Sequence, residues 1–321
     1  LLNYLVEEDN CAACHNGNVA GEDVMSVFNQ FSSHPIRDTL EVHDPAETSV
    51  VANRHVECSD CHNPHAARAG SSAVTGPLLG VRGIDINGIE LDPIIETYQL
   101  CFRCHADSPG RPPAPTPRQI EQTNTRLEFR LTNPSFHPLA GPGRNPDVPS
   151  LISPLSPVST IGCTDCHNSN AAPSAGGAGP EGPHGSAFEP ILVRQYLTLD
   201  NTPESPSSYA LCYSCHDRNS ILADQSFSLH NKHIVEERTP CNVCHDPHGI
   251  SDIQGNSINN THLINFDISV VFPAMGQMGG LQFTDNGRFA GSCTLNCHGR
   301  QHINLSYPGG GGPGSGGTGG G

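Results

Sequence analysis

Fourteen cysteines form seven close pairs, and a histidine directly follows the second cysteine of every pair. The pairs are Cys11/Cys14, Cys58/Cys61, Cys101/Cys104, Cys163/Cys166, Cys212/Cys215, Cys241/Cys244 and Cys293/Cys297. The histidines are His15, His62, His105, His167, His216, His245 and His298. C-x-x-C-H is the attachment signature of c-type haem. We therefore predict seven covalently bound haem c groups, with thioether bonds to all fourteen cysteines and an iron bond from each histidine.

Three other uses of paired cysteines explain less of the pattern. Zinc sites need two such pairs or further ligands, and they do not require a histidine after each pair. A redox C-x-x-C motif would occur once, in a βαβ context. A disulfide scaffold would leave the seven histidines unexplained. The seventh motif, "CTLNCH", carries one extra residue between its cysteines but keeps the histidine.

A six-coordinate iron needs a second axial ligand, and histidine is the abundant candidate. Eleven histidines lie outside the motifs, whereas the chain has only three methionines, Met25, Met275 and Met278. This supply favours bis-histidine iron. Three candidates follow a proline after a motif: His65, His184 and His248. Three follow "S-x" upstream of the second, fourth and sixth motifs: His34, His137 and His230. The last, His302, lies four residues after His298.

The remaining histidines rank lower. His233 competes with His230 for one position, and His55 is a reserve candidate because "NRH" at 53–55 echoes "NKH" at 231–233. His262 is possible and His43 is expected to be a bystander. We expect His65 to bind a neighbouring iron, because it would have to fold back across the ring to reach the iron that His62 binds.

The helices and strands that position these residues must be short, because the chain has too few apolar residues for an ordinary hydrophobic core. Apolar residues make up 35% of the chain, tryptophan is absent, and there are 34 Gly and 28 Pro. We predict a mostly irregular chain with short helices and little β structure, wrapped around a row of haems that serve as its core. A cysteine and a histidine four apart share one face of a helix, so we expect a helical turn at each motif. Further helices are predicted at 22–31 and 189–197. Residues 1–307 would form the seven-haem unit, and 308–321 a Gly-rich tail.

Charge and hydropathy limit the partners and the location. The net charge of −16 excludes nucleic acid as a partner on electrostatic grounds. No apolar run approaches the roughly 18 residues of a membrane span. The sequence starts at Leu1 without methionine, which suggests an exported product from which a signal was removed. We expect the protein outside the cytoplasm, at the cell surface or beyond.

An internal repeat links the motifs in pairs. "CSDCHNPHAA" leads through "GPLLG" to "YQLCFRCH", "CTDCHNSN" through "EPILV" to "YALCYSCH", and "CNVCHDPHGIS" through "THLINF" to "GSCTLNCHG". Haems two and three, four and five, and six and seven would thus pair, with the first standing alone. Up to the Gly-rich tail the chain resembles the doubled C-x-x-C-H family of multihaem cytochromes. An insertion before His184 and the extra residue in "CTLNCH" depart from the pattern.

The resemblance implies electron transport without catalysis, as in the extracellular cytochromes of metal-reducing microbes. Some of these polymerise into filaments, or nanowires, with one histidine ligand crossing between subunits. We accordingly expect a homopolymer that takes electrons from outer-membrane or periplasmic cytochromes and passes them to an extracellular acceptor. The alternatives are a monomeric periplasmic or surface shuttle and a multihaem reductase. The reductase is disfavoured because the only lysine, Lys232, lies outside the attachment motifs.

Overall fold

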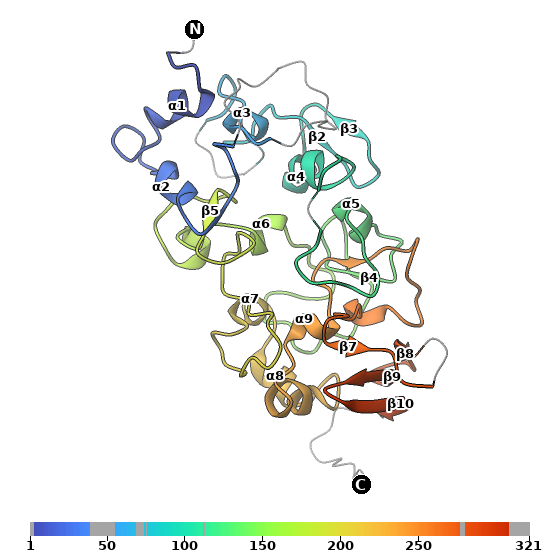
Figure 1. Cartoon of the computed structure of the whole chain (residues 1–321). Helices are drawn as coiled ribbons and strands as arrows, with labels where there is room; N and C mark the ends of the chain where they lie inside the picture. Colours follow the sequence, from blue (N-terminus) through green and yellow to red (C-terminus); the bar gives the residue numbers. More distant parts are fainter. Residues whose placement is uncertain are drawn as a thin grey trace. The chain divides into compact units, whose positions relative to one another are not determined.

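The computed structural model describes residues 3–38, 55–68, 74, 76–111, 113–276 and 280–307 (Figure 1). His43, Met278 and the Gly-rich segment 308–321 lie outside the described residues. In the described part, turns and irregular segments connect short helices and short strands. No helix in these ranges is both long enough and apolar enough to span a bilayer.

The helices are mostly one or two turns long. The α-helices are α1 Glu7–Ala12, α2 Val24–Phe28, α3 Cys58–Cys61, α4 Thr97–His105, α5 Thr125–Glu128, α6 Cys163–Cys166, α7 Ala210–Tyr213, α8 Arg218–Leu222 and α9 Cys241–Cys244. Two 3₁₀-helices, η1 Pro173–Ala175 and η3 Thr261–Leu263, and a π-helix, η2 Lys232–Glu236, complete the set. Within the range 22–31, where a helix is expected, only Val24–Phe28 is helical. This helix, α2, is capped by the Asp23 side chain, which accepts from the Ser26 amide at 3.0 Å.

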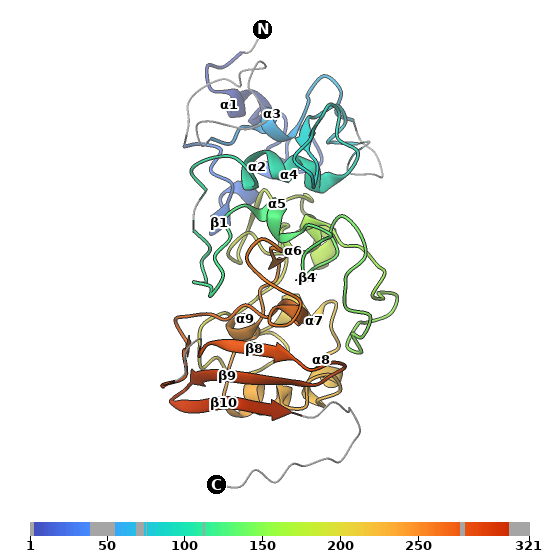
Figure 2. The same ribbon diagram turned by 90° about the vertical axis from the view of Figure 1, so that its right-hand side faces the viewer.

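The strands are also short, apart from those near the C-terminus. They are β1 Ser32–Ser33, β2 Gly83–Ile84, β3 Glu90–Leu91, β4 Ser135–Phe136, β5 Gly185–Ser186, β6 Gly249–Ile250, β7 Val271–Phe272, β8 Gln282–Asp285, β9 Gly291–Cys297 and β10 Arg300–Tyr307. Three two-stranded ladders pair β1 with β5, β2 with β3, and β4 with β6. A four-stranded antiparallel sheet pairs β9 with β7, β8 and β10, and its long strands are visible in Figure 2.

The chain divides into two compact units. The first comprises Leu1–Pro113, Thr123–Leu127 and Ile161–Gln195, and the second comprises Ala114–Gln122, Glu128–Thr160 and Tyr196–Gly321. The first four motifs belong to the first unit and the last three to the second. This boundary falls between the fourth and fifth motifs, which the sequence repeat groups as a pair.

The helical turn predicted at every motif is incomplete in the first and fifth motifs. α1 and α7 end before the second cysteine, so Cys14 and Cys215 lie in the turns that follow these helices and not on the helices themselves. Their amides donate to carbonyls only three residues back, Cys14 to Cys11 at 3.1 Å and Cys215 to Cys212 at 3.2 Å. Such bonds tighten the last turn of a helix and end it. In both motifs the histidine amide still donates to the carbonyl of the first cysteine at 2.9 Å, so the compact loop is kept.

The seventh motif lies on a strand, so the helical turn predicted there is wrong. Cys293 and Cys297 both belong to β9, and His298 follows at a φ of 49°. Side chains alternate faces along a strand, so residues four apart share a face whereas residues three apart do not. The extra residue in this motif therefore lets both thiols point to one side of a strand. Both pack against an apolar cluster in the second unit, formed by Val243, Phe266, Val271, Phe283 and Leu295.

The helix predicted at 189–197 is also absent. Residues 190–193 run instead along the fourth motif, where the Val193 amide donates to the Cys166 carbonyl at 2.8 Å and Leu192 forms a β-bridge with His167. Leu192 and Val193 are buried in this extended arrangement. The Val193 amide thus pairs with the motif, whereas the Leu192 amide donates to the Phe188 carbonyl at 2.8 Å in a single turn that does not continue as a helix.

Candidate functional site

Each unit contains the same small two-stranded structure, which we call the histidine clamp. In the first unit it consists of residues 32–35 and 183–186, and in the second of residues 135–138 and 247–250. β1 pairs with β5, and the His34 amide donates to the His184 carbonyl at 3.3 Å. β4 pairs with β6 in the same way, and the His137 amide donates to the His248 carbonyl at 2.9 Å. The clamp thus holds one "S-x-H-P" histidine beside one "P-H-G" histidine.

A glycine in each clamp permits a close backbone approach. A Cβ on Gly185 would lie 2.2 Å from the Val27 carbonyl oxygen, and a Cβ on Gly249 would lie 2.2 Å from the Glu128 carbonyl oxygen. Neither carbonyl can move away easily, because Val27 belongs to α2 and Glu128 belongs to α5. The glycine of the "P-H-G" element is therefore required by packing.

We expect Gly185→Ala to lower the free energy of unfolding of the haem-loaded protein by about 1–3 kcal/mol, the usual cost of overpacking. Guanidinium titration followed by circular dichroism would measure this loss. Gly21→Ala is the matched control, because a Cβ on Gly21 meets no atom within 4 Å. Equal stability of the two variants would contradict the close packing of the clamp.

Four motif histidines each face a second histidine from the predicted distal set. The distances between ring centres are 6.1 Å for His62 and His184, 6.2 Å for His105 and His34, 6.4 Å for His216 and His137, and 6.5 Å for His245 and His230. All four pairs lie within single units. The structure thus places His230, and not His233, opposite the sixth motif.

This spacing suits one metal ion between two imidazoles. An imidazole nitrogen binds a transition metal at about 2 Å, and its ring centre lies roughly 1 Å further back, so two axial rings stand about 6 Å apart. Rings in direct stacking contact would be closer. The donor set and its spacing therefore fit the iron of a bis-histidine haem.

The hydrogen bonds of Nδ1 in the paired rings support the same assignment. Nδ1 of His34 lies 2.6 Å from the Pro183 carbonyl, Nδ1 of His62 lies 3.1 Å from that of Pro77, and Nδ1 of His245 lies 2.8 Å from that of His262. A carbonyl only accepts, so these bonds put the proton on Nδ1 and leave the lone pair of Nε2 free. Such bonds are typical of metal-binding histidines, whose orientation they fix.

Two more rings make the same kind of bond. Nδ1 of His137 donates to the Pro247 carbonyl, and Nδ1 of His167 lies 3.0 Å from that of Pro190. The residues that supply carbonyls to the first histidine of each repeat are thus Pro77, Pro190 and His262. They occupy equivalent places in "GPLLG", "EPILV" and "THLINF". Sequence analysis missed this role of the bridge segments, although their alignment in the repeat was the available signal.

Burial lowers the pKa of several paired rings and so favours neutral imidazole, the form that binds metals. Burial lowers the pKa of His184, His216 and His245 to about 4, and neighbouring histidines add to the effect in all three. For His230, burial lowers the pKa to about 3. Nδ1 of His184 and Nδ1 of His230 are buried, and no hydrogen-bond partner reaches either atom within the described ranges.

The cysteines are present as unlinked thiols. All fourteen lie in the described part of the chain, and none forms a disulfide. Burial raises the pKa of Cys61 to about 12 and that of Cys293 to about 11, so these thiols are neutral. Metal-binding cysteines are thiolates. Among the described residues, the two ligand clusters compact enough for a single ion contain no cysteine; they are His55/Glu57/Asp60 and Glu128/Asp246/His248. The described cysteines therefore form no compact cluster of metal ligands.

The predicted attachment cysteines differ in exposure at the first motif. Cys14 is exposed, whereas the other thirteen cysteines are half-buried. It lies in the turn after α1, beside the equally exposed His15. Cys215 lies in the turn after α7, and its Sγ is 3.7 Å from the hydroxyl of the exposed Ser214. The wrapping of the chain around haem and all fourteen thioether bonds stay predictions from the motifs.

For several further predicted ligands the structure describes other contacts or positions. His298 points its Nε2 at Asp200, 3.0 Å from Oδ1, and His302 lies on β10. His233 donates from Nδ1 to the Leu229 carbonyl at 2.8 Å. His65 is exposed, and the structure gives no ring partner for it or for His15 in the described ranges. The reserve candidate His55 lies 3.8 Å from an oxygen of Asp60.

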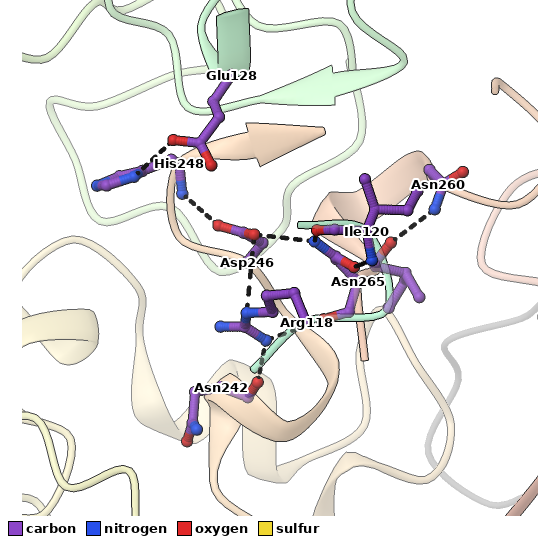
Figure 3. Close-up of polar contacts among 9 residues, drawn as sticks. Arg118, Ile120, Glu128, Asn242, Asp246, His248, Asn260 and Asn265 are labelled. Carbon is purple, nitrogen blue, oxygen red and sulfur yellow. Dashed lines mark hydrogen bonds and ion pairs between the residues drawn. The ribbon is translucent and has the colours of Figure 1, made fainter. Parts of the chain in front are cut away.

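His248 is held by a buried polar network (Figure 3). Its Nδ1 lies 3.0 Å from Glu128 Oε2, and its amide donates to Asp246 Oδ1 at 3.2 Å. Asp246 also accepts from Asn265 at 3.0 Å and lies 3.7 Å from the Arg118 guanidinium. Burial raises the pKa of Glu128, and the nearby His248 partly offsets this shift. Burial opposes a proton on His248, but the hydrogen bond and charge of Glu128 outweigh it and raise the pKa of His248.

Comparison of the chain with protein family models, curated protein sequences and solved structures finds no match in any of the three. The functional argument therefore rests on the motifs and on the contacts described above.

Proposed function

We propose that this protein is an electron-transfer protein that carries seven covalently attached c-type haems with bis-histidine iron, and that it is not an enzyme. One observation carries the proposal. Four motif histidines each face a second histidine with ring centres 6.1–6.5 Å apart. A C-x-x-C-H motif alone supplies one axial ligand, and a second imidazole at this distance supplies the other.

The chain's own residues explain why such sites would transfer electrons and not bind substrate. Haem iron, when bound, supplies the ferric–ferrous couple. At the four paired sites two imidazoles would hold the iron, and with both bound no coordination position would remain for a substrate. The Nδ1–H···O=C bonds hold His34 and His62 in place. Fixed ligands limit the rearrangement that accompanies a change of charge at the metal.

Intact mass spectrometry of the native protein tests the cofactor content directly. We expect seven haem increments on the polypeptide and a low-spin ferric absorption spectrum that does not change when cyanide is added at rest. A mass equal to that of the bare chain would refute the proposal. A high-spin band with cyanide or nitrite binding in the unaltered protein would favour the reductase alternative.

We further propose that the protein acts outside the cytoplasm as a homopolymer, receiving electrons from membrane or periplasmic cytochromes and delivering them to an extracellular acceptor. The support is the surplus of histidines, including the exposed His65. Electron microscopy of native material would show elongated filaments. Discrete single particles, together with a monomer in size-exclusion chromatography, would instead identify a shuttle.

A further inference from the structure

The helices that pack against the two histidine clamps carry different residues at one equivalent position. Val27 in α2 and Glu128 in α5 place their carbonyl oxygens against the clamp glycines at the same 2.2 Å from the ideal Cβ position. The next residue in each helix region is a phenylalanine. Phe28 contacts the His184 ring with 5.4 Å between ring centres, and Phe129 contacts the His248 ring at 5.3 Å. Val27 and Glu128 therefore occupy the same place in the two units.

This difference changes the surroundings of Nδ1 in His184 and in His248. In the first unit Val27 is apolar and 3% exposed, and Nδ1 of His184 is buried without a hydrogen-bond partner in the described residues. In the second unit Glu128 is 7% exposed and lies 3.0 Å from Nδ1 of His248 (Figure 3). The other predicted ligands whose Nδ1 contacts are described above bond to neutral oxygens. His248 instead bonds to a carboxylate through this atom.

We propose that Glu128 is a positioning residue that makes His248 a stronger electron donor to its iron than His184 is. The haem bound by His248 and the haem bound by His184 would then differ in reduction potential. This inference rests on the proposed bis-histidine haems. A carboxylate draws the Nδ1 proton toward itself and increases the electron density at Nε2. A stronger axial donor favours ferric iron and lowers the potential. The haem that His248 binds is then the more reducing of the two.

The test is a spectroelectrochemical titration of the full haem-loaded protein and its variants. Glu128→Gln keeps an oxygen acceptor of the same shape but removes the charge, and we expect one of the seven midpoints to move upward while six stay in place. Glu128→Val recreates the environment of His184 and should shift the same midpoint in the same direction. Val27→Glu should move a different midpoint downward.

Asp252→Asn is the matched control, because it removes one carboxylate charge from the same unit. Asp252 pairs with Arg130 at 3.2 Å, and its side chain is 29% exposed, so its loss should leave all seven midpoints in place. An unshifted titration for Glu128→Gln would overturn the inference. A uniform shift of all midpoints, or a shift equal to that of the control, would also overturn it, because the effect would then be general electrostatics.

The same samples separate this inference from the proposed function. Intact mass and the low-spin spectrum report whether seven bis-histidine haems are present, independently of any midpoint. Seven low-spin haems without a selective shift would leave the function standing and remove the role of Glu128. Loss of a haem in Glu128→Gln would show that the residue is needed for assembly, which also contradicts a tuning role.

Discussion

Replacing His34 with alanine is expected to leave all seven haems attached while converting one of them from low-spin to high-spin iron. The His34 ring faces the third-motif histidine, His105, at 6.2 Å, and its Nδ1 is bonded to Pro183, so its Nε2 is free to bind metal. Attachment depends on the thioethers of Cys101 and Cys104, which this change does not touch. The vacated position should bind cyanide or carbon monoxide in a ratio of one per protein. Absorption and electron paramagnetic resonance spectra would measure both effects.

His262→Ala is the matched control for this experiment. The His262 ring contacts Phe283 and lies 3.5 Å from Asp285, and its contribution to the sixth site is a backbone carbonyl that alanine retains. We expect no high-spin signal from this variant. A low-spin spectrum for His34→Ala, identical to that of the unaltered protein, would show that His34 is not an axial ligand and would remove the main support for the distal assignments.

The same spectra test whether His230 or His233 is the second ligand at the sixth motif. We expect His230→Ala to produce a high-spin haem at the site of His245, whose ring centre lies 6.5 Å from that of His230. His233→Ala should leave that site unchanged, because its ring packs beside Phe227 and its Nδ1 is bonded to Leu229. The opposite outcome for these two variants would contradict the arrangement around the sixth motif.

The sequence predicts the identity of candidate ligands better than their partners. His34 and His184 are identified by the repeated "S-x-H-P" and "P-H" patterns, but 150 residues separate them in the chain. Only the antiparallel ladder between β1 and β5 brings them together and directs them to the third and second motifs. Such a two-residue ladder has no hydrophobic period from which its partner could be predicted. The pairing therefore had to come from the structure.

The two wrong secondary-structure predictions have local causes. The segment 189–197 has an apolar pattern that suits a helix, yet Val193 pairs with Cys166 and the Pro190 carbonyl accepts from His167. These bonds depend on a motif about 25 residues earlier, which no helical pattern reveals. In the seventh motif, the spacing of Cys293 and Cys297 fits one face of a strand as well as one face of a helix. The neighbouring strands β7, β8 and β10 select the strand.

The second large effect is expected from removing an attachment site in the first unit. Cys101→Ser combined with Cys104→Ser should remove one haem and lower the free energy of unfolding by more than about 4 kcal/mol, beyond the usual range for substitutions. Both cysteines lie on α4, whose Phe102 is 1% exposed, near the buried Ile84 and Ile94. If a porphyrin completes this core, its loss leaves these side chains without their main apolar partner.

The paired change Cys293→Ser with Cys297→Ser is the informative comparison, because it also removes two thiols and one predicted haem. Here β9 keeps its hydrogen bonds to three strands, and the apolar cluster of Val243, Phe266, Val271, Phe283 and Leu295 remains. We expect less than half the loss of stability, and limited proteolysis should leave a fragment containing β7–β10 intact. In the α4 variant, cleavage should begin within the first unit. Equal destabilisation by the two changes would contradict the view that haem replaces an apolar core mainly where the chain lacks one of its own.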